Sequence, residues 1–445
     1  MTEGAPAGRR PAGLRSVGRA LRHRNYRLFF TGQGISLIGT WLTKVATSWL
    51  VYRLTGSAWL LGVVGFAGQI PTFLLAPLAG VLVDRWNRRR VLLATQTLAM
   101  LQSALLAGLA LSGLIRVWEV VALNVMQGLI DAFDMPVRQS MIVQMVEDRE
   151  DLPNAIALNS SMVNSARLLG PAIAGVLIAA VGEGWCFLID AVSYGAVILS
   201  VLLMRFDVKP LARKTTRVLQ EMAEGFRYVR GFAPVRALLL LLAVSGVAGR
   251  PFAVLLPVIA REVMRGGAGT LGTLQATAGV GALAGAIYLA SRTSVLGLGR
   301  LVAASAALFG LGLMAFSRAH VLWLAMPLLL LAATGMMLQT AASNTIIQTI
   351  VDDDKRGRVM SLFAMAFFGT VPFGSLLAGA LASRLGAQNT LLVGGLVCIV
   401  AAVIFLRALP ELRRVVRPIY VRMGILPEIA EGLQSAAQLT RPPEM

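Results

Sequence analysis

The sequence predicts an all-α membrane protein with twelve transmembrane helices arranged as two pseudo-symmetric six-helix bundles. Of its 445 residues, 56% are hydrophobic and only 14% are charged, whereas soluble domains carry about 25% charged residues. Apolar runs recur along the whole chain, and each exceeds the roughly 18 residues that a helix needs to cross a bilayer. These runs are too numerous to pack into one soluble core.

The apolar runs predict six helices in each half of the chain. In the first half we expect them at 27–53, 58–83, 91–113, 117–140, 156–181 and 185–205. In the second half we expect them at 236–260, 270–291, 300–317, 321–349, 359–384 and 389–407. This spacing predicts, in order, a basic amino-terminal tail (1–26), a first bundle (27–206), a linker (207–235), a second bundle (236–407) and an amphipathic tail (408–445).

The positive charges predict the orientation of the chain. If both termini lie in the cytoplasm, most of the 41 Lys and Arg residues fall on the cytoplasmic side, where positive charges accumulate in membrane proteins. Trp59, Trp118 and Trp185 then lie at the outer boundary, where amphipathic rings prefer to sit. The same bias explains the net charge of +19, so we expect no nucleic-acid partner. The arginine-rich start lacks an apolar stretch with a cleavage site, so we expect no removed signal peptide.

The two halves of the chain repeat one another. At one constant spacing, Ile142, Gln144, Asp148, Gly170, Gly175 and Gly182 recur as Ile346, Gln348, Asp352, Gly374, Gly379 and Gly386. Such a repeat is expected where two bundles rock about a central site and expose it to each side in turn. The repeat therefore predicts a secondary transporter.

The stretch from Gly80 to Arg90 resembles the signature loop of the major facilitator superfamily. Gly80 is expected to permit close helix packing, and Asp84 to meet the positive amino end of the eleventh helix. Asn87 stands where the family usually has Gly, a departure that the backbone tolerates because Asn can adopt a left-handed conformation. The resemblance implies a cytoplasmic gate formed by Gly80, Asp84, Arg85, Arg88, Arg89, Asp134 and Arg138.

Two further motifs resemble this superfamily. The stretch with Gly170, Pro171 and Gly175 is similar to the Gly-Pro motif of its exporters, in which proline bends a helix and small residues let helices pack closely. Asn124 begins a motif that usually starts with Arg, and because Asn carries no charge we expect no proton relay there.

Three other stretches narrow the resemblance to the enterobactin-exporter-like, or transmembrane secretion effector, branch. They begin at Leu54, Ala132 and Asp151. This branch implies a proton-coupled exporter of siderophores, drugs or other small amphipathic compounds in a bacterial inner membrane.

Ionisable residues inside the predicted spans indicate a binding cavity. A charge at the bilayer centre costs roughly 2.5–3.5 kcal/mol on insertion scales, so each calls for a partner or a role. Lys44 and Arg250 lie halfway along the first and seventh helices, which open the two halves, so we expect them to face each other. The predicted cavity, suited to an anionic or strongly polar substrate, comprises Trp41, Lys44, Ser48, Gln127, Asn164, Arg167 and Arg250. Alternatively, Lys44 and Arg250 merely neutralise buried aspartates.

Two acidic residues within the spans, Asp131 and Asp190, are candidates for proton coupling. Asp131 is preferred because the fourth helix normally lines the cavity of this fold. For Asp190 the alternative is an ion pair with Arg167 on the adjacent helix.

Catalytic chemistry is not expected from this chain. Its only histidines are His23 and His320, and no glycine-rich phosphate-binding loop occurs. We expect no enzyme activity, no cofactor and no metal site, and a monomer whose partners are a small-molecule substrate, protons and membrane lipid. A lipid or lysolipid flippase and a non-transporting receptor remain alternatives.

Overall fold

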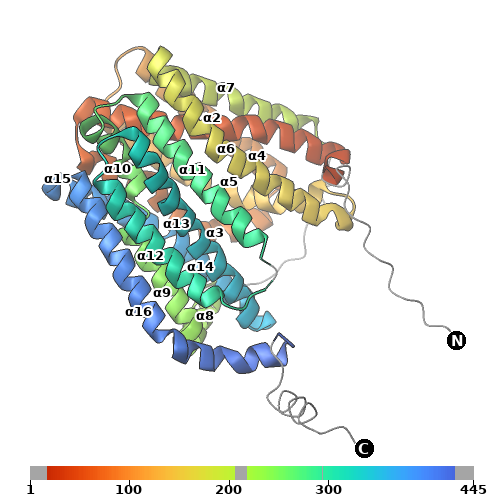
Figure 1. Cartoon of the computed structure of the whole chain (residues 1–445). Coiled ribbons are helices and arrows are strands. Elements are labelled where there is room, and N and C mark those ends of the chain that lie inside the picture. The colour runs from red at the N-terminus through yellow and green to blue at the C-terminus, as the bar shows by residue number, and fades with distance from the viewer. Residues whose placement is uncertain (1–17, 206–217, 293, 426–445) are drawn as a thin grey trace, which may run out of the picture. The chain divides into compact units, whose positions relative to one another are not determined.

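The computed structural model describes residues 18–205, 218–292 and 294–425, and this part of the chain is helical without any strand (Figure 1). Parts of both predicted tails and of the linker lie outside the described residues. Eleven helical segments in the described part are long and apolar enough to cross a membrane. The predicted all-α membrane fold is therefore confirmed.

Each predicted span of the first half is one helix, and short 3-10 turns precede the first and the fifth of them. The elements are η1 (Arg19–Arg22), α2 (Arg24–Thr55), α3 (Ala58–Arg85), α4 (Arg88–Leu111), α5 (Val117–Met145), η2 (Arg149–Asp151), α6 (Leu152–Val181) and α7 (Glu183–Leu203). The helix α2 is the predicted span that is absent from the eleven apolar segments. Its 32 residues give a length of about 48 Å, so polar composition, not length, sets it apart.

Two predicted spans of the second half are interrupted. The elements are α8 (Val218–Gly231), α9 (Ala233–Ala248), α10 (Phe252–Val258), the π-turn η3 (Ile259–Val263), α11 (Ala268–Ala290), α12 (Leu298–Ser317), α13 (Leu322–Ile350), α14 (Asp353–Phe368), α15 (Thr370–Leu385) and α16 (Ala387–Arg422). The seventh span breaks between α9 and α10, where Pro251 lacks the backbone N–H that a helix interior needs. The eleventh breaks at Gly369 between α14 and α15. Broken membrane helices free backbone polar groups for other partners.

Helical structure also extends into the predicted linker and tail. The helix α8 occupies part of the linker, and its Glu224 forms a 3.0 Å ion pair with Arg358 of α14. Burial raises the pKa of the Tyr228 phenol in α8, and the nearby Asp352 carboxylate adds to the shift. At the other end, α16 continues past the predicted boundary at residue 407 as one unbroken helix.

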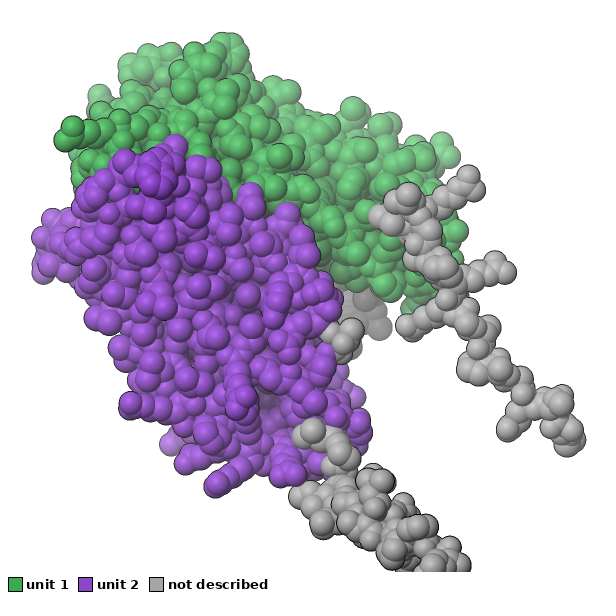
Figure 2. Space-filling view, viewed as in Figure 1, with its two compact units in different colours: residues 1–214, 256–276 green, residues 215–255, 277–445 purple. Residues whose placement is uncertain are grey.

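Internal contacts divide the chain into two compact units (Figure 2). Unit 1 comprises residues 1–214 and 256–276, and unit 2 comprises residues 215–255 and 277–445. In unit 1, α2 packs against α6 and α7, while α3 packs on α5. In unit 2, α12 packs against α13 and α16.

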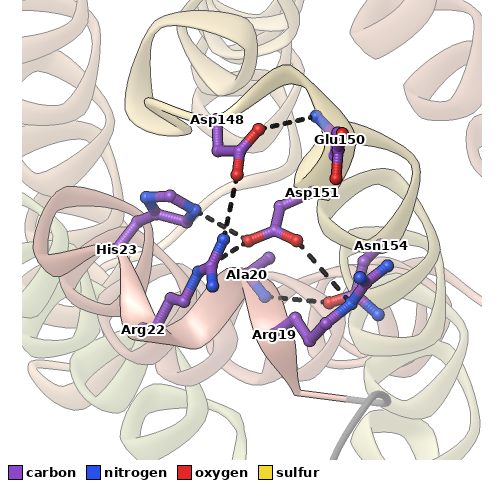
Figure 3. A network of polar contacts seen from close by, with 8 residues as sticks. All are labelled: Arg19, Ala20, Arg22, His23, Asp148, Glu150, Asp151 and Asn154. Atoms are coloured by element: carbon purple, nitrogen blue, oxygen red, sulfur yellow. Dashed lines mark hydrogen bonds and ion pairs between the residues drawn. The ribbon is translucent and has the colours of Figure 1, made fainter.

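A polar network ties the start of α2 to the loop that enters α6 (Figure 3). The Asp151 carboxylate, only 1% exposed, accepts from the Nε of Arg22 at 2.8 Å and lies 3.0 Å from the Nε2 of His23. The backbone N–H of Ala20 donates to the Oδ1 of Asn154 at 2.9 Å. One buried carboxylate thus links η1, α2 and α6.

We expect the Asp151→Asn substitution to destabilise unit 1 by about 1–3 kcal/mol, because hydrogen bonds to charged groups contribute roughly that much. Thermal unfolding can be followed by thiol labelling, since the free cysteines Cys186 and Cys398 are both buried. Asp148→Asn is the matched control, because Asp148 is half-exposed and contacts only the exposed Arg22 at 3.1 Å and the backbone N–H of Glu150 at 3.0 Å among the described residues. Equal unfolding temperatures for the two variants would contradict a central role for Asp151.

Candidate functional site

The cation in the middle of α2 has an aromatic neighbour and makes no ion pair within the described residues. The ammonium of Lys44 lies 4.8 Å from the ring centroid of Trp41. The side chain is exposed, and no described carboxylate forms an ion pair with it. Ser48 follows one turn later, and its hydroxyl donates to the Val45 carbonyl at 2.9 Å. A charged group that faces lipid within a span is costly, so the exposed side of Lys44 suits an aqueous or ligand-filled space.

A second cation lies on the neighbouring helix α6. Arg167 is half-buried, and within the described ranges it makes neither an ion pair nor a hydrogen bond. Its charge is close enough to interact with that of Lys44. The two helices meet at Gly170, where an added Cβ would overlap Trp41. Asn164, by contrast, bonds within α6 by donating to the Ser160 carbonyl at 2.9 Å.

The preferred proton-coupling candidate lies on α5. Asp131 is half-buried, and its Oδ1 accepts from the Nε2 of Gln127 at 2.9 Å. Its carboxylate and the Lys44 ammonium interact electrostatically. The amide oxygen of Gln127 is buried without a hydrogen-bond partner in the described structure. Unit 1 thus holds a hydrogen-bonded carboxylate and amide, and a lysine whose charge interacts with both that carboxylate and Arg167.

The other acidic candidate is enclosed by neighbouring helices. Asp190 on α7 is 1% exposed, and its Oδ2 accepts from the hydroxyls of Thr43 and Ser103, both at 2.8 Å. Its Oδ1 is buried without a recorded partner, and an added Cβ at Gly39 would approach it to 2.7 Å. The ion pair with Arg167 that we considered is not among the contacts of the described residues. Thr43 and Ser103 were not predicted, because the sequence does not show which hydroxyls face a buried carboxylate.

The predicted gate residue Asp134 is held by three side chains. It is 4% exposed, and its Oδ2 forms a 2.7 Å ion pair with the Nε of Arg138, one turn later on α5. Its Oδ1 accepts from the Thr95 hydroxyl at 2.9 Å and from the Nε2 of Gln96 at 2.7 Å. The two α4 residues were missed by sequence reasoning, since polar side chains in a helix carry no distinctive local pattern.

The remaining gate residues lie around the α3–α4 turn. Arg88 is buried, Arg85 is exposed, and Arg89 donates to the Leu202 carbonyl at 2.9 Å. The side chain of Asp84 lies outside the described residues. At Gly80, an added Cβ would meet no described heavy atom within 4 Å.

Asn87 does not use the left-handed backbone that Asn can adopt. Its φ is −70°, and its side chain accepts from the backbone N–H of Arg90 at 3.2 Å. Asn87 is therefore the N-cap of α4, a position that Asn favours because its side-chain oxygen satisfies a free N–H group.

In unit 2, Arg250 stands at the break between α9 and α10. Its Nη1 donates to the Phe367 carbonyl at 2.7 Å, and its guanidinium lies 3.4 Å from the Phe367 ring centroid. Phe367 is in the last turn of α14, where carbonyls lack partners within the helix. Arg250 therefore joins the two broken spans. Lys44 belongs to unit 1, so the two cations expected to face each other lie in separate units.

Small residues let α6 and α11 approach closely within unit 1. Added Cβ atoms at Gly175 and Gly272 would lie 3.0 Å from the Ala268 carbonyl and 2.6 Å from the Pro171 carbonyl, respectively. These neighbours are backbone atoms, which cannot move aside cheaply. Nearby, Tyr52 at the end of α2 donates to the Glu262 carboxylate in η3, a contact that the sequence did not predict.

We expect Gly272→Ala to destabilise the protein by about 1–3 kcal/mol, because overpacking a close helix contact has that cost. Thermal unfolding of the purified protein measures the effect. Gly267→Ala is the control, since an added Cβ there would meet nothing within 4 Å. If both variants unfold at the wild-type temperature, α6 and α11 do not depend on this close approach.

Comparison with known proteins assigns the chain to a family. Residues 17–417 match the model of the transmembrane secretion effector family. The chain is 26% identical to the staphyloferrin A transporter of Staphylococcus aureus, over 85% of this chain and 95% of that protein. It is 28% identical to the multidrug efflux pump Tap of Mycolicibacterium fortuitum, over 85% and 95% respectively.

A solved structure has the same fold. It is the bacterial homologue of the human lysosomal transporter Spinster in an inward-facing, unoccupied conformation, with a TM-score of 0.69 and 15% identity. The similarity covers 89% of this chain and 98% of that one. The protein is a multi-pass membrane protein and not an enzyme, and it belongs to the transmembrane secretion effector family of the major facilitator superfamily.

Proposed function

We propose that this secondary transporter exports a small anionic or amphipathic compound, such as a siderophore, drug or metabolite, in exchange for protons. The observation that carries the anionic preference is the pair of cations, Lys44 and Arg167, that form no ion pair with any described carboxylate. The staphyloferrin A transporter and multidrug efflux pump among its relatives support export of small molecules. A cation without a counter-ion within a membrane span is costly, so a negatively charged substrate would stabilise both.

The cavity would combine charge recognition with an aromatic surface. Trp41 lies beside Lys44 and offers a flat apolar surface for a ring or hydrocarbon portion of the substrate. Gln127 has a buried amide oxygen free to accept a hydrogen bond. Ser48 lies on α2 with Lys44, and Asn164 lies on α6 with Arg167. Arg250 would contribute a third positive charge from the break in the seventh span.

Proton exchange would take place at Asp131. The carboxylate has one neutral partner, Gln127, and a cation within electrostatic reach, Lys44. For an exchanger, the cavity must hold the substrate and the proton in turn and not together. Asp131 would take up a proton on the outer side after the substrate has left, and would release it to the cytoplasm before the next substrate binds, with the Lys44 cation favouring the charged carboxylate at release.

The transport cycle would alternate access between the two sides of a bacterial inner membrane. The two six-helix bundles would move about the cavity, with both termini in the cytoplasm and the protein acting as a monomer. The buried Asp134–Arg138 pair and the arginines of the α3–α4 turn would form the cytoplasmic gate.

Transport into inside-out vesicles tests this function. We expect an anionic siderophore or drug to accumulate against its gradient, with protons leaving the vesicles, and a protonophore to abolish accumulation. Accumulation that persists with the protonophore would exclude proton coupling. Movement of fluorescent lipid between leaflets without uptake of any soluble compound would favour a flippase instead, and binding without movement would indicate a receptor.

A further inference from the structure

The helix α16 is much longer than a bilayer requires. Its 36 residues extend about 54 Å, whereas a hydrocarbon core about 30 Å thick takes roughly 20 residues. Counted from Ala387, the residues after Arg407 therefore lie beyond the core. Pro410 stands inside the helix and favours a bend. In Figure 1 the last turns of α16, in dark blue, run in a different direction from its earlier part. Residues 408–422 are called the α16 extension below.

One side of the α16 extension is part of the folded core of unit 2. Leu409 and Val416 are 6% and 9% exposed and belong to the buried cluster of this unit. Leu412, Ile419 and Tyr420 pack against the same cluster. The extension is therefore held in a defined orientation by its apolar side.

The other side of the extension carries arginines without partners. Arg413, Arg414, Arg417 and Arg422 are all exposed, and none makes an ion pair or hydrogen bond to any described residue. At about 100° per residue, Arg414, Arg417 and Arg422 lie on the helix surface away from Val416, and Arg413 lies at the border of the packed side. Glu411 is the only acidic residue in the extension, so the charges are not balanced within it.

The helix α8 repeats this arrangement on the same core cluster. Val229 belongs to the cluster, while Arg227 and Arg230 are exposed. Each helix also leaves a large apolar side chain exposed, with Phe226 54% exposed on α8 and Val415 45% exposed on the extension. Amphipathic helices that combine basic and exposed apolar side chains are typical of the membrane headgroup region.

We propose that the exposed arginines of the α16 extension, with Arg227 and Arg230 of α8, bind the phosphate groups of anionic phospholipids. A guanidinium group presents paired N–H donors that match phosphate oxygens. Anionic leaflets attract basic residues at this depth, and bound phosphates relieve the repulsion between neighbouring arginines. Exposed Phe226 and Val415 would enter the acyl boundary beside the headgroups. Anionic lipid would thereby stabilise unit 2, whatever the transported substrate.

The test is a lipid titration of the purified full chain in neutral detergent, with thermal unfolding as the readout. We expect phosphatidylglycerol to raise the unfolding temperature and phosphatidylcholine to have little effect. Each of Arg413→Gln, Arg414→Gln and Arg417→Gln should weaken apparent phosphatidylglycerol affinity about fivefold, and the triple variant should lose the selectivity. All variants should unfold at the wild-type temperature without lipid, since these side chains have no recorded contacts.

The matched control is Arg384→Gln, an exposed arginine at the end of α15. It lies at the opposite end of α16 from the extension and should leave lipid selectivity unchanged. Wild-type selectivity in the triple variant would overturn the proposal. So would an equal loss in Arg384→Gln, which would indicate a general charge effect. Equal stabilisation by inorganic phosphate would assign the surface to free anions and also overturn it.

Discussion

Lys44→Ala is expected to raise the half-saturating concentration of an anionic substrate about tenfold or more. A hydrogen bond to a charged group contributes about 1.5–3 kcal/mol, and each 1.4 kcal/mol is a factor of ten in affinity. Lys44 forms no ion pair with a described carboxylate, although its charge acts on Asp131, so its removal breaks no direct contact with a carboxylate. Arg167→Ala should act in the same direction. Initial rates of uptake into inside-out vesicles, measured over a range of substrate concentrations, give the change.

Two comparisons make this result specific. Lys355→Gln should leave the half-saturating concentration unchanged, because Lys355 pairs with Asp354 at 3.0 Å at the start of α14. Lys44→Ala should raise the half-saturating concentration of a neutral substrate analogue much less than that of the anion. Unchanged affinity in Lys44→Ala, Arg167→Ala and Arg250→Ala alike would rule out a cationic cavity.

Asp131→Asn is expected to reduce substrate-dependent proton movement to the level of vesicles without the protein. The amide is nearly the same size as the carboxyl group and can keep the contact with Gln127, but it cannot take up or release a proton at physiological pH. Downhill substrate movement should continue, because the cavity cations remain. A pH-sensitive dye inside the vesicles and labelled substrate measure the two movements together.

Asp190→Asn distinguishes the two candidate carboxylates. Asp190 is enclosed and accepts from Thr43 and Ser103, so its replacement should lower stability while leaving proton coupling intact. Wild-type coupling in Asp131→Asn would eliminate Asp131. Loss of coupling only in Asp190→Asn would assign the proton site to α7 instead.

Side-chain partners were the least predictable part of the candidate site. The sequence placed Lys44, Arg167, Asp131 and Asp190 within membrane helices, because a charge in an apolar run is visible locally. It did not predict that Asp190 would be enclosed by hydroxyls from two other helices. Nor did it predict that Arg250 would bind the end of α14, since these residues are far apart in the chain.

The helix limits likewise divide into those that a local pattern shows and those that it does not. Most predicted spans agree with the structure within a few residues, because the length of an apolar run is set by bilayer thickness. The breaks at Gly249–Pro251 and Gly369 were not predicted. A largely apolar run continues through both breaks. A proline or glycine in such a run can either bend a helix or interrupt it.

The sequence by itself determined that the chain is a helical membrane protein, where its spans lie, that its halves are related and which family it resembles. Apolar length, charge bias and motif spacing are properties of contiguous residues, so they need no knowledge of packing. Only the tertiary structure decided which buried charges have partners, where two spans break and how α8 and the end of α16 dock on unit 2. These features depend on contacts between residues that are distant in the chain, and no local pattern records which helix face meets which neighbour.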